Sequence, residues 1–417
     1  MSRGARPHRR TFDSLRLHRN YRLYFSGQSV SQIGTWLQGA AQSWLVLELT
    51  HSAVDVGLVS FWQFLPFTLF GLFGGALSDR IDPRRTLIFS QSAMGVLAVA
   101  LAAFVWLHMT NMALIYLIAA LRGIVMIFNS PSLQRLMIQI VGREELANAI
   151  SLNSGVNNAT RIVGPGLAGI LIAAAGVGWC FALNAVSYVA VVIALWMMQP
   201  AEYFPLRTAE ARAPMLQSVV EGLRYAVRTP AVWVPLILLT VISITGINFS
   251  VLLPVLAAQT LHAGPEVFGL LSSLFGLGAV LGALIAAALS RATWPILFLS
   301  AAGYSLFQIL LAPQRELWLV LVFLMAVGVC YTIYTSATNA MVQLAAPDAL
   351  QGRVAGLYSY VFLGTSPLGA LFAGYLSEAG GTQLAFGAAG VIGVAVTVLS
   401  AIGIRHRRAA DLAGQGG

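Results

Sequence analysis

The chain has 417 residues, of which 58% are hydrophobic and only 9% charged, and its mean hydropathy is +0.79. Soluble globular domains average roughly 45–50% apolar and about 25% charged residues, so this composition excludes an ordinary soluble protein and predicts a polytopic membrane protein. The net charge of +9 does not indicate a nucleic-acid surface, because all 24 basic residues are arginines clustered between apolar runs. Two cysteines, Cys180 and Cys330, in or beside apolar runs support neither a disulfide framework nor a cysteine metal site.

Twelve segments are long and apolar enough to cross a bilayer as helices, which takes about 20 residues each. Glycine and proline inside several of them do not argue against helices, because both are common in transmembrane helices. The sequence therefore predicts an all-α membrane protein with twelve transmembrane helices. The predicted spans cover residues 22–49, 54–78, 86–108, 112–137, 146–175, 179–198, 231–258, 266–290, 294–312, 316–343, 350–377 and 383–404.

The distribution of arginine predicts the orientation of the chain. An even number of spans puts both termini on one side, and with the N-terminus in the cytoplasm 21 of the 24 arginines fall in cytoplasmic segments. Of the others, Arg122 and Arg161 lie inside spans, and Arg315 lies in a segment on the outer side of the membrane. The first twenty residues are basic but lack the apolar core of a secretory signal, so we expect a retained cytoplasmic tail.

A long polar connection, residues 199–230, divides the spans into two sets of six. The predicted units are an N-terminal half with its tail, residues 1–198, and a C-terminal half with a short tail, residues 231–417. Within the connection one helical face is apolar and another carries Arg224 and Arg228, which is typical of a helix lying on a membrane surface. A tether between the halves explains this segment, and a partner-binding role is the alternative.

Short matches indicate that the two halves repeat one another. Residues 57–60 (GLVS) resemble residues 269–272 (GLLS), and residues 137–140 (MIQI) resemble residues 341–344 (MVQL), in the same order. Transporters built from such repeats bind their substrate between the repeats, near the middle of the bilayer. The repeat therefore favours a transporter.

Charged residues crowd into the segment between the second and third spans, GGALSDRIDPRRTLI at residues 74–88. It resembles the signature of the major facilitator superfamily in this loop, Gly-x-Leu-Ala-Asp-Arg-x-Gly-Arg-Lys. The fitting residues are Gly75, Leu77, Asp79, Arg80 and Arg84, and the departures are Ser78, Asp82 and Pro83. Ordinary positive-inside charge accounts for the arginines but not for Gly75 and Asp79 at this spacing.

This resemblance implies a fold of two six-helix halves and a role for the loop in gating. In the superfamily the loop's charges contact neighbouring helix ends and stabilise the outward-facing state. The gating residues predicted on this basis, which do not touch the substrate, are Gly75, Asp79, Arg80, Arg84 and Arg85. The corresponding loop of the second half has lost most of these charges, so the expected gate is asymmetric.

Two ionisable side chains inside spans are candidates for proton coupling. Arg122 lies about 15 Å into the fourth span, where a charge is costly and indicates a functional site by default. The superfamily has an arginine motif in this span that is linked to proton coupling, and Arg122-Gly123 resembles it. A structural pair or a carbonyl contact is the alternative for Arg122. Glu48, near the outer end of the first span, is a candidate proton carrier or an ordinary interfacial carboxylate.

The fifth span carries the stretch SGVNNATRIVGPGLAG, residues 154–169. It resembles the Gly-Pro-x-x-Gly-Gly signature of the superfamily's exporters in four residues, Gly155, Gly164, Pro165 and Gly169, although alanine replaces one of the glycines. Small residues let helices approach closely and proline interrupts the backbone hydrogen bonds. The stretch therefore favours export, and ordinary small-residue packing is the alternative.

Polar side chains recur at helical spacing inside several spans, which indicates a wall facing protein or water instead of lipid. Cavity lining is the prediction, and hydrogen bonding between helices is the alternative. The predicted lining residues are Gln28, Gln32, Thr35, Asn129, Asn153, Asn157, Arg161, Asn248, Tyr331, Thr335 and Asn339. Arg122 and Arg161 outnumber the carboxylates placed inside spans, so the cavity is expected to favour anionic or zwitterionic cargo.

Nearly the whole chain resembles the drug:proton antiporter branch that contains macrolide efflux proteins and the enterobactin exporter. This implies a secondary active exporter of a small amphipathic molecule, a drug or siderophore, working by proton antiport and alternating access. The expected setting is a bacterial cytoplasmic membrane with both termini inside, and the expected partners are lipid, substrate and protons, in a monomer. A lysolipid or lipid flippase, an importer of the same fold, or a non-transporting receptor are the alternatives.

Other classes lack support in the sequence. The chain has no lysine and no phosphate-binding Gly-x-x-x-x-Gly-Lys motif, so ATP hydrolysis is not expected. Six scattered histidines predict no metal site, and no paired acids or nucleophile constellation predict an enzyme. We expect no cofactor, no metal, no nucleic-acid partner and no catalytic residue.

Overall fold

The computed structural model describes residues 12–78, 81–205, 215–289 and 291–414, with side chains omitted for residues 72–78, 215–219, 348–349 and 407–414. The described chain is helical and contains no strand. Ten of its stretches are long and apolar enough to cross a membrane. The more polar helix over residues 19–50 is not among the ten and adds one crossing. The last of the ten stretches is divided by a kink and contains two crossings, so the helices confirm the predicted twelve-helix fold.

The helices up to residue 205 follow the predicted spans closely. After the short α1 (Asp13–Leu17), they are α2 (Arg19–Thr50), α3 (Ala53–Ser78), α4 (Pro83–Trp106), α5 (Met112–Val141), α6 (Leu146–Ala175) and α7 (Val177–Met197), followed by the single turn η1 (Pro200–Glu202). We call α2–α7 the first set.

The remaining helices form the second set and the element that leads into it. They are α8 (Met215–Arg228), α9 (Pro230–Gly246), α10 (Phe249–Val255), the π-helical η2 (Leu256–Thr260), α11 (Pro265–Leu289), α12 (Trp294–Leu311), α13 (Leu317–Leu344), α14 (Asp348–Gly364) and α15 (Ser366–Gly414). The name second set is used below for α9–α15.

Three predicted spans differ from straight helices. The seventh is broken into α9 and α10, where the Asn248 side chain donates to the carbonyl of Ser243 (3.2 Å) and so replaces part of the interrupted backbone bonding. The eleventh breaks at Thr365, between α14 and α15. The twelfth begins after a kink at Gly380 and Gly381, where Gly381 has φ of +69°, and its helix continues to residue 414 instead of ending near 404.

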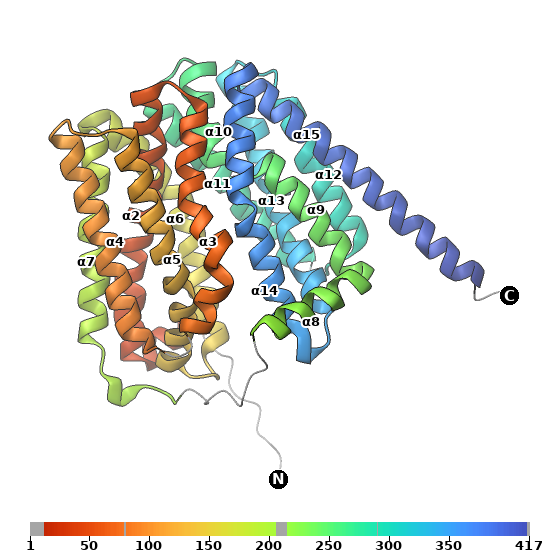
Figure 1. Ribbon diagram of the computed structural model, residues 1–417, viewed down its shortest axis with the longest axis horizontal. Helices are drawn as coiled ribbons and strands as arrows, with labels where there is room; N and C mark the ends of the chain where they lie inside the picture. The colour runs from red at the N-terminus through yellow and green to blue at the C-terminus, as the bar shows by residue number, and fades with distance from the viewer. Residues whose placement is uncertain (1–11, 79–80, 206–214, 290, 415–417) are drawn as a thin grey trace, which may run out of the picture.

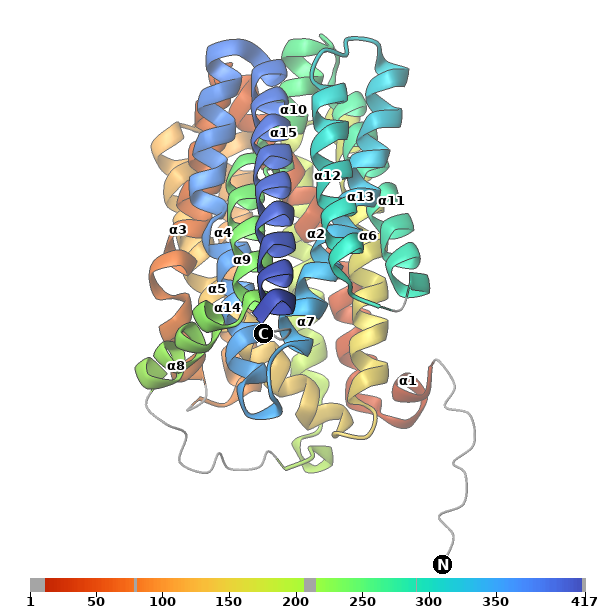
Figure 2. The same cartoon turned by 90° about the vertical axis from the view of Figure 1, so that its right-hand side faces the viewer.

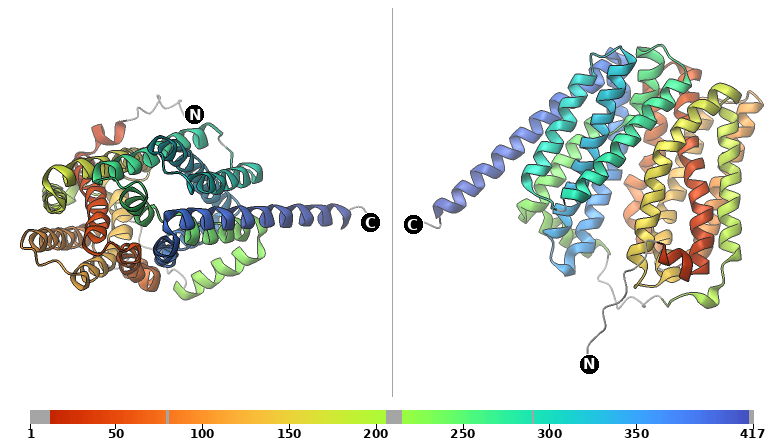
Figure 3. Two further views of the ribbon diagram at one scale, coloured as in Figure 1. Left: turned by 90° about the horizontal axis from the view of Figure 1, so that it is seen from above. Right: turned by 180° about the vertical axis from the view of Figure 1, so that it is seen from behind.

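The first set lies on one side of the bundle and the second set on the other (Figure 1). They meet along two seams, one between α3 and α15 and one between α6 and α11, seen from the front in Figure 1 and from behind in Figure 3. The ends of the bundle differ in charge. One, the arginine-rich end, carries Arg84, Arg143 and Arg353, and the opposite end carries His51, Gln259 and Glu378.

Glycines bring the backbones together at both seams. A Cβ atom on Gly57 of α3 would lie 2.5 Å from the carbonyl oxygen of Ala370 on α15, and one on Gly169 of α6 would lie 3.0 Å from the Cα of Gly269 on α11. Gly57 and Gly269 are matching positions of the internal repeat. The repeat therefore places the same small residue of each half at the seam, as expected where helices pack without a hydrophobic driving force between them.

Helix α8 runs crosswise to the bundle axis and lies against the first part of α14 (Figures 1 and 2). Its Ala226 is buried, and Tyr225 donates to the carbonyl of Ala345. Glu221 forms an ion pair with Arg353 of α14. Val220, Leu223 and Val227 remain exposed at 45%, 51% and 66%. The predicted amphipathic helix is present, and its docking on a membrane surface stays a prediction.

Candidate functional site

The last residues of the charged loop contact two helix ends in the first set, the start of α4 and the end of α7. Asp82 is the N-cap of α4, where a carboxylate oxygen accepts from the N–H of Arg85 (2.8 Å), and Pro83 takes the first helical position. These two residues depart from the superfamily signature, and both favour the start of a helix at this point, Asp82 as its cap and Pro83 as its first residue. Arg84 donates to the carbonyls of Leu195 (2.8 Å) and Trp196 (3.0 Å) at the end of α7.

The other predicted gating residues are placed less fully. Gly75 lies in the last turns of α3, and Asp79 and Arg80 lie outside the described residues. The side chain of Arg85 is exposed. Arg84 is therefore the gating candidate with described side-chain contacts, and they lie within the first set.

At the opposite end, polar side chains join the two sets. Glu378 of α15 accepts from the N–H of Ala53 (2.8 Å) and from the Ser52 hydroxyl (3.3 Å), so a carboxylate of the second set caps the first turn of α3. Gln259 of η2 donates to the carbonyl of His51 (3.0 Å). Sequence reasoning missed Glu378, because nothing local marks it as a cap for a helix 325 positions away.

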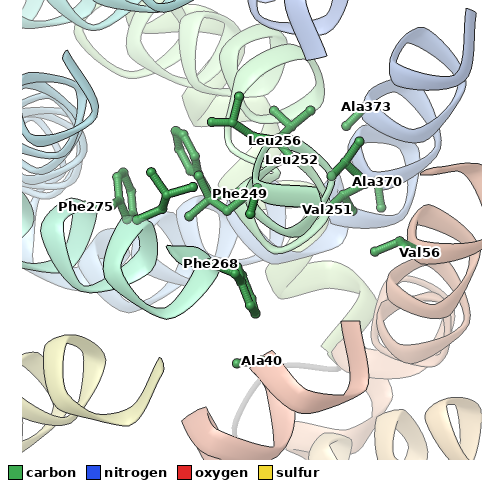
Figure 4. Packing of buried hydrophobic residues seen from close by; sticks show 14 of the residues in the cluster. Ala40, Val56, Phe249, Val251, Leu252, Leu256, Phe268, Phe275, Ala370 and Ala373 are labelled. Atoms are coloured by element: carbon green, nitrogen blue, oxygen red, sulfur yellow. The ribbon is translucent and has the colours of Figure 1, made fainter. Parts of the chain in front are cut away.

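An apolar cluster lies behind these contacts. In Figure 4 Phe268 of α11 lies beside Ala40 of α2, and Val251 of α10 lies between Phe249 and Val56 of α3; all of these residues belong to one buried cluster. The rings of Trp44 and Phe268 stack across the two sets, with centroids 5.8 Å apart and planes 14° apart. This cluster closes the space between the sets at the opposite end.

Arg122 lies on α5 and is 6% exposed. Its guanidinium donates to Oε1 of Gln42 on α2 (2.8 Å), and Nε2 of Gln42 has no partner among the described residues. Gly123 allows α5 to approach α3 closely, since a Cβ there would lie 2.1 Å from the carbonyl of Gln63. Arg122 is thus held by an amide within the first set, with a polar donor left beside it.

Two carboxylates of the first set, Glu48 and Asp55, lie toward the opposite end. Glu48 is exposed, two residues before the end of α2, and accepts from the indole of Trp44 (2.8 Å). It lines a pocket of about 210 Å³ together with His51 and Gln259. Asp55, in the first turn of α3, accepts from the hydroxyl of Tyr116 (2.6 Å). Sequence reasoning passed over Asp55 because it stands at the very start of a span.

The residues of the exporter motif divide between two contacts. Gly164 faces α2, where an added Cβ would lie 2.5 Å from the Cβ of Trp36, and Gly169 faces α11 across the seam. Pro165 is buried, and its carbonyl lies 2.8 Å from where Gly269 would carry a Cβ. Gly155 has open space beside it. Three of the four motif residues therefore serve close helix packing.

The predicted lining residues fall into two groups. Asn129 accepts from Ser90 (3.0 Å) and Gln91 (3.3 Å) of α4, and Asn248 caps the break before α10, so both make structural hydrogen bonds. The other nine lie on α2, α6 and α13 and are half-buried or exposed except for Tyr331, which is 4% exposed: Gln28, Gln32, Thr35, Asn153, Asn157, Arg161, Tyr331, Thr335 and Asn339.

Side chains of three other helices surround Arg161 of α6. The central carbon of its guanidinium lies 5.7 Å from the ring centroid of Trp36 on α2, 5.8 Å from that of Phe275 on α11 and 5.6 Å from that of Tyr331 on α13. We call these four residues the Arg161 cage. Trp36 and Phe275 were missed, although Trp36 lies one turn from Gln32 on the polar face of α2.

Known proteins resemble the chain over most of its length. A family model for transmembrane secretion effectors matches residues 11–415. The chain is 26% identical to the enterobactin exporter EntS of Escherichia coli (94% of each chain) and 28% identical to the multidrug efflux pump Tap of Mycolicibacterium fortuitum (85% of this chain, 88% of that one). The staphyloferrin A transporter of Staphylococcus aureus is 24% identical, over 63% of this chain and 65% of that transporter's length.

Solved structures share the fold. A bacterial homologue of the human lysosomal transporter Spinster, in an inward-facing and occupied conformation, superposes with a TM-score of 0.72 at 13% identity, covering 92% of this chain and 96% of that one. A mutant of the nucleoside transporter NupG gives 0.69 at 12% identity, covering 92% and 99%. With the family model, this confirms the fold and family predicted from sequence. The chain belongs to the transmembrane secretion effector family of the major facilitator superfamily and is a multi-pass membrane transporter.

Proposed function

We propose that this protein is a secondary active exporter of a small amphipathic molecule, driven by proton antiport. The observation that carries the proposal is the arrangement of contacts: the two sets are joined at the opposite end, and the Arg161 cage lies farther in, between them. The relatives include an enterobactin exporter and a multidrug efflux pump. They support export and make siderophores and drugs the first compounds to test.

We propose alternating access on the basis of the same arrangement. In the proposed scheme Asn153 and Asn157, on the turns of α6 between Arg161 and the arginine-rich end, line the path by which substrate reaches the cage from that end. When the seams at the opposite end separate, the cage becomes accessible from there. Each set moves as a unit in this scheme, with the division at residues 199–230.

The orientation rests on the arginines. We place the arginine-rich end and both termini in the cytoplasm of a bacterial cell, as the positive-inside rule requires, and we take the protein as a monomer. The structure then corresponds to a state in which substrate enters from the cytoplasm. Labelling of cysteines introduced one at a time at Arg315 and Arg143 tests this, because only the first is then accessible to an impermeant reagent from outside intact cells.

Export is tested by measuring the accumulation of candidate compounds in cells with and without the protein, repeated with a protonophore. We expect lower accumulation in expressing cells and loss of the difference when the proton gradient collapses. Net uptake of the compound would instead support an importer of the same fold. Efflux that persists with the protonophore would contradict proton coupling, and transbilayer movement of a labelled lysolipid would favour the flippase.

For gating we propose that Asp79, Arg80 and Arg84 stabilise the state opposite to this one without contacting substrate. An ion pair at a helix end is a contact that forms in one state and breaks in the other. Asp79→Ala should therefore lower the transport rate while leaving substrate binding intact. Unchanged turnover in a well-expressed variant would contradict a role of the loop in gating.

For proton coupling we propose Arg122 together with a carboxylate at the opposite end, Glu48 as predicted or Asp55. The test is the proton-driven efflux rate of Arg122→Gln, Glu48→Gln and Asp55→Asn, with efflux down a substrate gradient as the second readout. Loss of only the proton-driven rate identifies the coupling residue. If all three variants lose both rates equally, these residues serve the fold instead.

A further inference from the structure

The guanidinium of Arg161 is surrounded by aromatic rings that come from both sets. Ring centroids of Trp36, Phe275 and Tyr331 lie 5.6–5.8 Å from its central carbon. At distances up to about 6 Å the negative face of a ring attracts a cation. The rings therefore stabilise the charge of Arg161 inside the bundle without neutralising it.

The position of Arg161 is held firmly by the neighbouring helix. Its carbonyl oxygen lies 3.0 Å from where a Cβ on Gly276 of α11 would stand, so only glycine leaves this crossing undisturbed. The next carbonyl, that of Ile162, accepts from the hydroxyl of Ser273 on α11 (2.7 Å). Two contacts of α11 thus fix the backbone from which the guanidinium projects.

The edge of the guanidinium has no acceptor assigned to it in the described part of the chain. No carboxylate there forms an ion pair with Arg161, whereas Arg353 pairs with Glu221 and Arg122 donates to Gln42. A guanidinium carries five N–H donors in its plane, and aromatic rings do not satisfy them. Arg161 is only partly buried, and in the proposed function it lies beside the substrate path between the sets.

We propose that the Arg161 cage is the substrate site and that it takes an organic anion with a flat aromatic group. The carboxylate, phenolate or phosphate of the substrate accepts from the edge of Arg161, a geometry that suits bidentate binding. The aromatic group packs among Trp36, Phe275 and Tyr331, which offer ring faces. A small hydrated anion finds too few donors there to replace its water, and a cation is repelled.

This inference rests on the proposed function, because the bound anion is taken to be the exported substrate, but binding itself can be measured without transport. Binding is measured by calorimetry on the purified full-length protein, with three probes of related shape. They are 2-naphthoate, the matched cation 2-naphthylmethylammonium, and decanoate as an anion without rings. We expect 2-naphthoate to bind most tightly, decanoate more weakly and the cation least.

Variants separate charge from ring contacts. Arg161→Gln should weaken 2-naphthoate binding about tenfold or more, the scale of losing hydrogen bonds to a charged group, and Arg161→Lys should restore part of it. Tyr331→Leu should reduce the preference for 2-naphthoate over decanoate while keeping the preference for anions. Arg315→Gln removes one arginine from an exposed loop and is the control, expected to bind as the unaltered protein does.

The melting temperature of each variant shows whether it is folded. The proposal is overturned if 2-naphthoate does not bind, if the cation binds equally well, or if a folded Arg161→Gln variant binds as before. Failure of the proposed function looks different: the probes bind as described, yet cells show no protein-dependent efflux of any aryl anion. Efflux that Arg161→Gln leaves unchanged would contradict the site and leave export standing.

Discussion

The two ends of the bundle are held together in different ways. At the opposite end, contacts cross between the two sets: Glu378 caps α3, Gln259 reaches the carbonyl of His51, and Trp44 stacks on Phe268. At the arginine-rich end, the contacts of the described loop residues stay within the first set: Arg84 donates to the carbonyl of Leu195 at the end of α7, and Arg135 donates to the carbonyl of Ile81 (3.2 Å).

This difference teaches which parts of the molecule can move as units. Contacts inside a set keep it rigid and do not oppose its rotation relative to the other set. Contacts between the sets must break when the opposite end opens. Bistable packing of this kind is the usual basis of large transitions, because packed interfaces have discrete arrangements. The predictions below challenge the two ends in turn, from the largest expected effect to the smallest.

The largest effect is expected at the seam between α6 and α11. In Gly169→Leu the new Cβ would lie 2.5 Å from the carbonyl oxygen of Pro265, so the helices must separate. Overpacking of a tight contact costs about 1–3 kcal/mol, enough to shift the balance of states about tenfold. We expect transport to fall at least about tenfold, and a cysteine at Val56, buried in the apolar cluster, to become reactive.

The control for this variant is Gly403→Leu, because a Cβ on Gly403 would have no neighbouring atom within 4 Å. It should transport and react with thiol reagents as the unaltered protein does. All proteins carry Cys180→Ala and Cys330→Ala, so that only the introduced thiol is labelled. If Gly169→Leu keeps full transport and a protected Val56→Cys thiol, the seam does not hold the opposite end closed.

A smaller effect is expected for Glu378→Gln. The amide keeps an oxygen that can accept from the N–H of Ala53 but has no charge. Because the side chain is exposed, solvent screens the charge of Glu378, and removing that charge costs little interaction energy. We expect the opposite end to open about two- to fivefold more often, measured as the labelling rate of the Val56→Cys thiol. Glu316→Gln, in an exposed loop at the same end, is the matched control. Equal labelling in both variants would deny the cap a role in closure.

The smallest effect is expected for Asp82→Ala at the arginine-rich end. It removes the N-cap of α4, a contact inside the first set, and should lower the free energy of unfolding by about 1 kcal/mol. Because the contact does not cross between the sets, the labelling rate of Val56→Cys should not change. Asp82→Asn, which can still cap, should restore the melting temperature. A change in labelling with unchanged stability would mean that this end also takes part in closure.

The spans were predictable because a run of apolar residues is a local property. The breaks inside the seventh and eleventh spans were not, since a side-chain amide at Asn248 and a turn at Thr365 interrupt runs that are equally apolar on both sides. Asp82 and Pro83 are readable as a cap and a first helical residue once α4 is known to begin there. Within the predicted lining, Asn129 and Asn248 form hydrogen bonds between and within helices, which spacing alone does not distinguish from lining.

The sequence by itself determined the membrane class, the twelve crossings, the expected orientation and the family. Hydropathy, arginine placement and short motifs carry that information without reference to distant residues. Only the tertiary structure decided that rings of α2, α11 and α13 surround Arg161, that Glu378 caps α3 and that each matching glycine of the repeat lies at one of the two seams. The physical reason is that these contacts depend on how helices far apart in the chain cross: helical spacing shows which residues share a face, but not which distant helix that face meets.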